Sequence, residues 1–218
     1  MSLNAKEAML RRAARDIEAG MTVNLGIGLP TQVANFLPES LPVCLHSENG
    51  IAGVGPSLTY VDADRNLIDA GGTYVSPIAG TSYFDSAVSF AIVRSGRLDL
   101  TLLGAFQIGA TGDLANWKIP SLFTPGAGGA IELAQKARKV AVITTHTDKK
   151  GQPKILTECT LPLTAQKCVS RIYTDMAVID VTPDGLRLVE IADGIESDDV
   201  INATDAPLIV PDHAIPTF

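Results

Sequence analysis

A glutamate set among turn-forming residues is the feature of the sequence that most suggests chemistry. Glu48 lies in the sequence Ser-Glu-Asn-Gly at residues 47–50, directly after the apolar residues 41–46 and before the glycine-rich residues 51–56. A short apolar run bounded by turn formers is typical of a buried strand. Glu48 would then follow the carboxyl end of a strand, where ligands bind in open α/β sheets. A carboxylate held there could act as a base, a metal ligand or a nucleophile.

The simpler interpretation of Glu48 is a solvated turn residue, and residue type alone favours it. Its neighbours shift the balance towards chemistry. Ser47, Asn49 and Gly50 are small or polar, and they suit a tight turn that presents one side chain. Glycine at such a turn also lets a bulky ligand approach the backbone closely. We therefore take Glu48 as the first candidate for a catalytic residue.

A second candidate is the sequence Gly-Ala-Gly-Gly at residues 126–129, which precedes a predicted helix. Backbone N–H groups there could bind an anion or an oxyanion, and the alternative is an ordinary turn into the helix. The segment is not a dinucleotide fingerprint, because Ile131 stands where the third glycine should be. Gly-Ile-Gly at residues 26–28 fails the same test, since Thr31 occupies that place. Neither segment continues as a P-loop.

Other polar residues carry weaker signals. Asn24 and Asn116 are predicted at a strand end and in a loop, where an asparagine is either a buried hydrogen-bonding residue or simply part of a turn. His46, His146 and His213 lie far apart and lack metal-ligand spacing, so we predict no metal site. We interpret His46 as a structural histidine. The sequence has no Gly-x-Ser-x-Gly motif, which leaves a hydrolase triad with little support.

Size and composition indicate a globular domain. The chain has 218 residues, 46% of them hydrophobic, and a formal net charge of −7. These values predict one large domain with a substantial core rather than a disordered chain. The acidic balance and the lack of a basic cluster argue against nucleic acid as a partner.

The ends and the cysteines bear on the compartment. Residues 1–12 are charged and lack an apolar signal core, and the apolar runs are too short to span a bilayer. The three widely spaced cysteines, Cys44, Cys159 and Cys168, fit reduced thiols better than a disulfide framework. We therefore expect a cytoplasmic protein without a membrane partner.

Helix and strand patterns alternate along the first two thirds of the chain. The expected helices are at residues 5–19, from Pro30 to before Pro38, around Phe84, Val88 and Ile92, over 126–137, and after Ser197 as a cap. The expected strands are at residues 21–25, 41–46, 98–103 and 140–144, followed by a hairpin of 177–181 and 186–191 around Pro-Asp-Gly. Residues 50–72 are predicted as mostly loop, and the tail from Pro211 as loose.

This alternation of strands and helices predicts an α/β fold. We expect a single domain over residues 1–218, with an ordered core of residues 5–210. Its sheet should be open and mainly parallel, with flanking helices and a C-terminal antiparallel hairpin.

Taken together, the motifs resemble those of a known family. The chain is similar to the B (β) subunit of family I coenzyme A transferases, of the succinyl-CoA:3-oxoacid and 3-oxoadipate type. The matching stretches are in family order and span nearly the whole chain: Asn-Leu-Gly-Ile-Gly-Leu-Pro (24–30), Ser-Glu-Asn-Gly (47–50), Gly-Asp-Leu-Ala-Asn-Trp (112–117), Gly-Ala-Gly-Gly-Ala (126–130) and Cys-Thr-Leu-Pro-Leu-Thr (159–164).

The resemblance implies an enzyme in which Glu48 is the nucleophile. It implies that the backbone at Gly128 and Gly129 helps to form an oxyanion site, that Asn24 orients Glu48, and that Asn116 lies close to bound coenzyme A. It further implies coenzyme A thioesters as substrates and no permanently bound cofactor. The partner chain that it implies is the A (α) subunit of the same transferase, in a heterodimer or heterotetramer.

One position departs from the family pattern. Relatives of the animal 3-oxoacid type carry a lysine after Ala-Gly, where this chain has Gly72. The departure weakens the inference of a particular substrate. Two other functions stay open at this stage: hydrolysis of an acyl-CoA at the same glutamate, and ligand binding by a non-catalytic relative.

Overall fold

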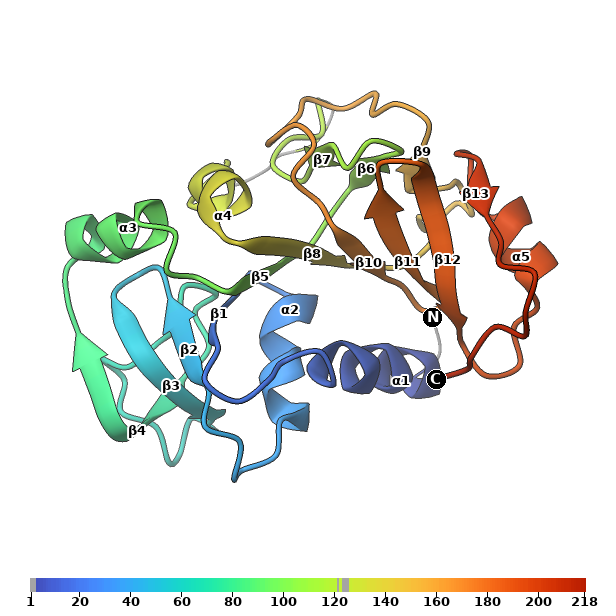
Figure 1. The fold of residues 1–218 in the computed structure, drawn as a ribbon. Helices are drawn as coiled ribbons and strands as arrows, with labels where there is room; N and C mark the ends of the chain where they lie inside the picture. The colour runs from blue at the N-terminus through green and yellow to red at the C-terminus, as the bar shows by residue number, and fades with distance from the viewer. Residues whose placement is uncertain (1–2, 121, 123–125) are drawn as a thin grey trace.

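The computed structural model describes residues 3–120, 122 and 126–218 (Figure 1). In this part of the chain ten strands form one large sheet, in the spatial order β13 (Leu208–Ile209), β12 (Gly185–Ile191), β11 (Ala177–Thr182), β10 (Arg171–Tyr173), β8 (Lys139–Ile143), β5 (Leu100–Leu103), β1 (Thr22–Leu25), β2 (Cys44–Ser47), β3 (Ile51–Ser57) and β4 (Val75–Tyr83). Three short strands form a second sheet, in the order β7 (Leu114–Ala115), β6 (Gln107–Gly109) and β9 (Ile155–Leu156).

The centre of the large sheet is parallel. Strands β2, β1, β5, β8 and β10 each pair in parallel with their neighbours within this group. All four residues of β5 are buried, as expected for parallel strands that are covered on both faces. Antiparallel pairs flank this centre, with β3 and β4 on one side and the β11–β12 hairpin on the other. The predicted single-domain α/β fold, with a mainly parallel sheet and a C-terminal hairpin, is confirmed.

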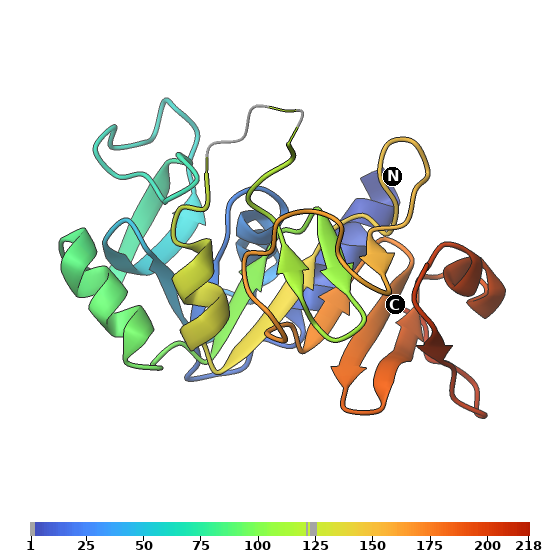
Figure 2. The same ribbon diagram turned by 90° about the horizontal axis from the view of Figure 1, so that it is seen from above.

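The helices cover both faces of the sheet (Figures 1 and 2). Helix α1 (Leu3–Ala14), helix α2 (Leu29–Gln32) and the 3₁₀ helix η1 (Val33–Phe36) lie on one face, whereas α3 (Ser86–Arg94), α4 (Ala130–Lys136) and the small sheet lie on the other. Helix α5 (Ser197–Asn202) lies beside β13. Each face has its own hydrophobic core, and the adjacent Leu102 and Leu103 enter opposite cores because side chains alternate along a strand.

The prediction of a loop over residues 50–72 is wrong for its first part, because residues 51–57 form β3 and pair with β4. The glycines that suggested a loop are required by this close pairing. A Cβ at Gly55 would lie 2.7 Å from the Ser76 Oγ, and a Cβ at Gly53 would lie 3.1 Å from the Thr81 Cα. Glycine inside a strand often marks such an approach of another backbone.

The C-terminal tail is also better held than the sequence suggests. The Ile191 N–H donates to the Pro216 carbonyl at 3.0 Å, and the Phe218 N–H donates to the Ile191 carbonyl at 3.1 Å. The prediction of a loose tail from Pro211 is therefore wrong, because the end of the chain bonds to the end of β12. Every helix in the described residues is too short or too polar to cross a bilayer.

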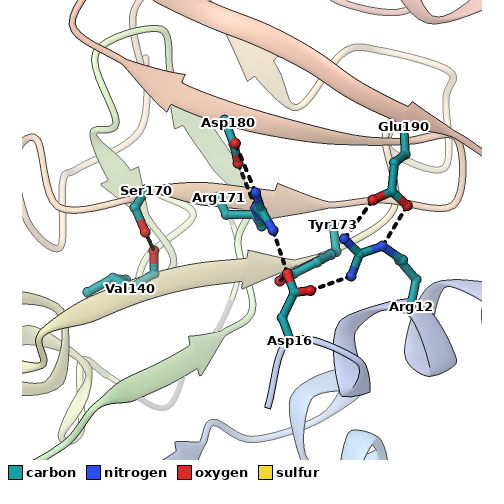
Figure 3. A network of polar contacts seen from close by, with 8 residues as sticks. All are labelled: Arg12, Asp16, Val140, Ser170, Arg171, Tyr173, Asp180 and Glu190. Carbon is teal, nitrogen blue, oxygen red and sulfur yellow. Dashed lines mark hydrogen bonds and ion pairs between the residues drawn. The ribbon is translucent and has the colours of Figure 1, made fainter. Parts of the chain in front are cut away.

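A network of charged side chains fastens α1 to the sheet (Figure 3). It joins Arg12, Asp16, Arg171, Tyr173, Asp180 and Glu190. The buried Arg12 guanidinium donates to both Glu190 carboxylate oxygens, at 2.6 and 2.7 Å, and to Asp16 at 2.7 Å. Bidentate, charge-assisted bonds of this kind offset the cost of burying the arginine. The N-terminal helix is thus tied to the C-terminal half of the sheet.

Candidate active site

Glu48 lies in the turn between β2 and β3, directly after the end of β2. The turn requires glycine at residue 50, where φ is +122° and a Cβ would lie 2.0 Å from the Phe84 carbonyl oxygen. The Phe84 N–H donates to the Gly50 carbonyl at 3.0 Å, which holds the turn against the segment before α3. This geometry fixes the backbone from which the half-buried Glu48 side chain projects.

Asn24 lies on the neighbouring parallel strand and contacts Glu48 directly. It pairs with His46 in the β1–β2 register, its side chain is fully buried, and its Nδ2 donates to the Glu48 Oε2 at 2.9 Å. The Nδ2 also donates to the His46 carbonyl at 3.1 Å, and the Asn24 Oδ1 accepts from the Thr101 hydroxyl at 3.4 Å. The asparagine is therefore held from both adjacent strands, and it holds one carboxylate oxygen in turn.

His46 supports this pair from behind. Its ring is 3% exposed, lies within 3.1 Å of the Ser89 Oγ through Nε2, and stacks on Phe84 with centroids 6.1 Å apart. Burial lowers the pKa of His46 to about 4, so the ring is neutral at neutral pH. Sequence reasoning identified His46 as structural but missed Ser89 and Thr101. The spacing of His46 and Glu48 by two residues was the only local sign that both belong to one site.

Gly129 brings the backbone before α4 against Glu48. A Cβ at this residue would lie 3.2 Å from the Glu48 Cγ and 3.0 Å from the Phe90 ring. The adjacent Gly128 has a φ of +51°, which glycine adopts at little cost. Helix α4 begins at Ala130, as the sequence predicted.

These segments surround a pocket of about 500 Å³. Among its described lining residues Glu48 is the only ionisable one, and the rest are mainly glycine, alanine and larger apolar residues. The lining residues include Gly26, Ile27, Glu48, Gly104, Ala105, Asn116, Gly128, Gly129 and Thr144. The pocket thus lies at the carboxyl ends of β1, β2, β5 and β8, the edge predicted for a ligand site.

Asn116 lines the same pocket from the loop after β7. Its Nδ2 donates to the Gly104 carbonyl at 3.0 Å, and its Oδ1 accepts from the Thr164 hydroxyl at 2.6 Å. Residues 112–117 and 159–164, two of the motifs noted in the sequence, are therefore joined at this point. The structure brings Glu48, Asn24, Gly128, Gly129 and Asn116 together at one site.

A loop that the sequence did not implicate closes over the turn. The Ser47 Oγ accepts from the Ala70 N–H at 2.8 Å, and the Asn49 side chain donates to the Ile68 carbonyl at 2.7 Å. Gly72, where some relatives carry a lysine, has a φ of +80° with no atom within 4 Å of a Cβ position. The space would admit a longer side chain, but the backbone conformation favours glycine.

Comparison with known proteins places this geometry in a family. The family model described as coenzyme A transferase matches residues 6–203. The chain belongs to the coenzyme A transferase family. This confirms the resemblance noted in the sequence.

Two named relatives illustrate the similarity, and both are B subunits. This coenzyme A transferase family member is 48% identical over 206 residues to that of the 3-oxoadipate CoA-transferase of Acinetobacter baylyi, and the match covers 94% of each chain. It is 44% identical over 206 residues to that of the probable succinyl-CoA:3-ketoacid coenzyme A transferase of Bacillus subtilis, with 94% of this chain and 95% of that protein covered.

Solved structures agree on the fold. The acyl-CoA transferase YdiF of Escherichia coli O157:H7 matches 100% of this chain with a TM-score of 0.78 at 20% identity. The chain spans 44% of the length of that protein. Glutaconate coenzyme A-transferase of Acidaminococcus fermentans matches 97% of this chain and 90% of its own with a TM-score of 0.70 at 15% identity.

Proposed function

We propose that the chain is the B subunit of a coenzyme A transferase that forms a glutamyl-CoA thioester on Glu48. The reaction moves coenzyme A from an acyl-CoA, such as succinyl-CoA, to a 3-oxoacid or another short carboxylic acid. The observation that carries the proposal is the position of Glu48. It is the only ionisable residue among the described residues that line the pocket, and it lies between the Asn24 amide and the backbone at Gly129.

A carboxylate suits this chemistry because it can accept both the acyl group and coenzyme A. Glu48 attacks the donor thioester carbonyl, the C–S bond breaks, and a mixed anhydride and the coenzyme A thiolate form. The thiolate then attacks the glutamyl carbonyl and releases the donor acid, leaving the enzyme thioester. The acceptor carboxylate reverses these steps and regenerates Glu48, which makes the catalysis covalent and ping-pong. The thioester is exchanged rather than hydrolysed, so ATP is not needed.

The neighbouring residues have distinct roles in the proposal. Asn24 orients Glu48 by holding one carboxylate oxygen at 2.9 Å, which leaves the other free to attack. Each tetrahedral intermediate carries negative charge on a former carbonyl oxygen, and backbone donors at Gly128 and Gly129 would stabilise it. Such donors contribute roughly 3–4 kcal/mol in comparable sites. Asn116, fixed by Gly104 and Thr164, would lie beside the bound coenzyme A.

The proposal includes a partner chain. The named relatives are B or beta subunits, and YdiF is more than twice as long as the segment that matches this chain. We therefore expect activity only when an A subunit completes the site, in a heterodimer or heterotetramer in the cytoplasm. Coenzyme A thioesters enter as substrates, and we expect no permanently bound cofactor.

The test replaces Glu48 in the assembled two-chain enzyme. Glu48→Gln should abolish transfer of coenzyme A from succinyl-CoA to a 3-oxoacid, whereas Glu39→Gln, at an exposed position, should not affect it. Release of free coenzyme A is measured with and without the acceptor acid. Release that does not depend on the acceptor would instead support hydrolysis at the same glutamate. Full transfer by Glu48→Gln would contradict the proposal.

A further inference from the structure

A lysine ammonium lies directly behind one wall of the pocket. The Lys154 Nζ donates to the Thr144 hydroxyl at 2.9 Å and to the Thr145 hydroxyl at 2.8 Å. Thr144 follows β8, lines the pocket, and donates its own hydroxyl hydrogen to the Ala105 carbonyl at 3.1 Å. A single hydroxyl group therefore separates this positive charge from the pocket residues.

Lys154 has no carboxylate partner in the described part of the chain. No aspartate or glutamate there lies within 4.0 Å of its ammonium, and its described hydrogen bonds use two of its three donors. Burial lowers the pKa of Lys154, while Asp175 and Asp148 raise it from beyond ion-pair distance. Lysines that are removed from water are usually paired, so an unpaired one needs another explanation.

The structural explanation is that Lys154 fastens the loop between β8 and β9. Backbone bonds already close this loop, since the Lys154 N–H donates to the His146 carbonyl at 3.1 Å and the Asp148 N–H donates to the Gln152 carbonyl at 2.8 Å. A neutral side chain would also serve to hold two threonine hydroxyls. The positive charge itself is therefore the feature to be explained.

The proposed reaction supplies a reason for the charge. Glu48 is negative, and the acid substrate that must come close to it is also an anion, so the two repel each other in a largely apolar pocket. We infer that Lys154, acting through Thr144, supplies the positive potential that favours binding of the carboxylate substrate. Lys154 is then a positioning residue for this substrate. This inference rests on the proposed function.

The experiment compares three variants of the assembled enzyme. Lys154→Met removes the charge and keeps much of the volume, Lys154→Arg keeps the charge, and Lys149→Met removes a charge from the exposed part of the same loop. The KM for the carboxylic acid, the KM for the acyl-CoA, kcat and the thermal unfolding midpoint are measured for each. For Lys154→Met we expect the KM for the acid to rise roughly tenfold, as loss of a nearby unit charge implies. Lys154→Arg should restore it to within about threefold, and Lys149→Met should match the wild type.

The outcomes separate this inference from the proposed function. If the wild-type complex does not transfer coenzyme A, the proposed function is wrong. If the wild-type complex is active and Lys154→Met keeps an unchanged KM for the acid, the inference is wrong, whether or not the unfolding midpoint falls. Equal increases in KM for Lys154→Met and Lys154→Arg would also overturn it, because they would show a role of shape rather than of charge.

Discussion

Gly129 lies against Glu48, with the position of a Cβ on Gly129 only 3.2 Å from the Glu48 Cγ. Gly129→Ala should therefore push the carboxylate or the Phe90 ring, which would lie 3.0 Å from the same methyl group, out of place. We expect kcat to fall about 10- to 100-fold, since small displacements of a nucleophile are costly.

The matched control for this change is Gly104→Ala. Gly104 lines the same pocket, but no atom lies within 4 Å of its Cβ position. The added methyl group should affect KM more than kcat. Steady-state kinetics of both variants in the assembled enzyme make the comparison. A kcat for Gly129→Ala equal to that of the wild type would show that contact with Glu48 is unimportant.

Asn24→Ala should impair catalysis and stability together. It removes the 2.9 Å bond to Glu48 and leaves the buried Thr101 hydroxyl and His46 carbonyl without this partner. A hydrogen bond to a charged group contributes about 1.5–3 kcal/mol, so we expect kcat to fall roughly 10- to 100-fold. Kinetics and urea unfolding check this, with the exposed Asn66→Ala as the control. Normal kcat in a folded Asn24→Ala enzyme would argue against an orienting role.

Gly50→Ala should destabilise the fold far more than Gly20→Ala. Both residues have positive φ, +122° and +84°, but only at Gly50 would a methyl group meet the backbone, 2.0 Å from the Phe84 carbonyl oxygen. For Gly20→Ala we expect about 1 kcal/mol of conformational strain. For Gly50→Ala we expect about 3 kcal/mol or more, because the turn that carries Glu48 must shift. Thermal unfolding of the two variants measures the difference, and similar unfolding midpoints would contradict this account of the turn.

The buried histidines make stability depend on pH. Burial lowers the pKa of both His46 and His146 from 6.5 to about 4, although Asp175 partly opposes the shift at His146. Since the unfolded chain binds these protons first, their contribution is full above about pH 6.5 and is lost as the pH falls towards 4. Each histidine contributes of the order of 3 kcal/mol.

Urea unfolding at several pH values between 7 and about 4 tests this dependence. His146→Gln should make the free energy of unfolding less dependent on pH in this range, because one of the two groups no longer titrates. His213→Gln, at an exposed position, should keep the wild-type dependence. An unfolding free energy of the wild type that stays constant from pH 7 to about 4.5 would mean that the buried histidines do not control acid stability.

Some of the fold could be predicted from local signals. Pro-Asp-Gly at residues 183–185 marked the β11–β12 hairpin, and the apolar residues 98–103 marked a central strand. Residues 51–57 could not be predicted as a strand, because their glycines satisfy the close approach of β4, a partner that only the fold reveals. At α3 the spacing of Phe84, Val88 and Ile92 found the helix but not its buried face, which carries Ser89 and Val93.

The candidate site divides in the same way. Glu48 and Gly129 carried signals in their own sequence neighbourhoods, and the fold brings them together. Thr101 and Ser89 carried none, since their contact with Asn24 and His46 depends on strand register and on the packing of α3. Lys154 is likewise invisible without the position of Thr144.

Covalent attachment of coenzyme A to Glu48 is the central claim, and peptide mass spectrometry tests it most directly. The assembled enzyme is incubated with acyl-CoA and no acceptor, treated with borohydride, digested and analysed. Borohydride reduces a glutamyl thioester to an alcohol, so we predict reduction at Glu48 in the wild type and at no residue in Glu48→Gln. An active enzyme in which Glu48 stays an unmodified carboxylate, or in which another residue is reduced, would contradict the account.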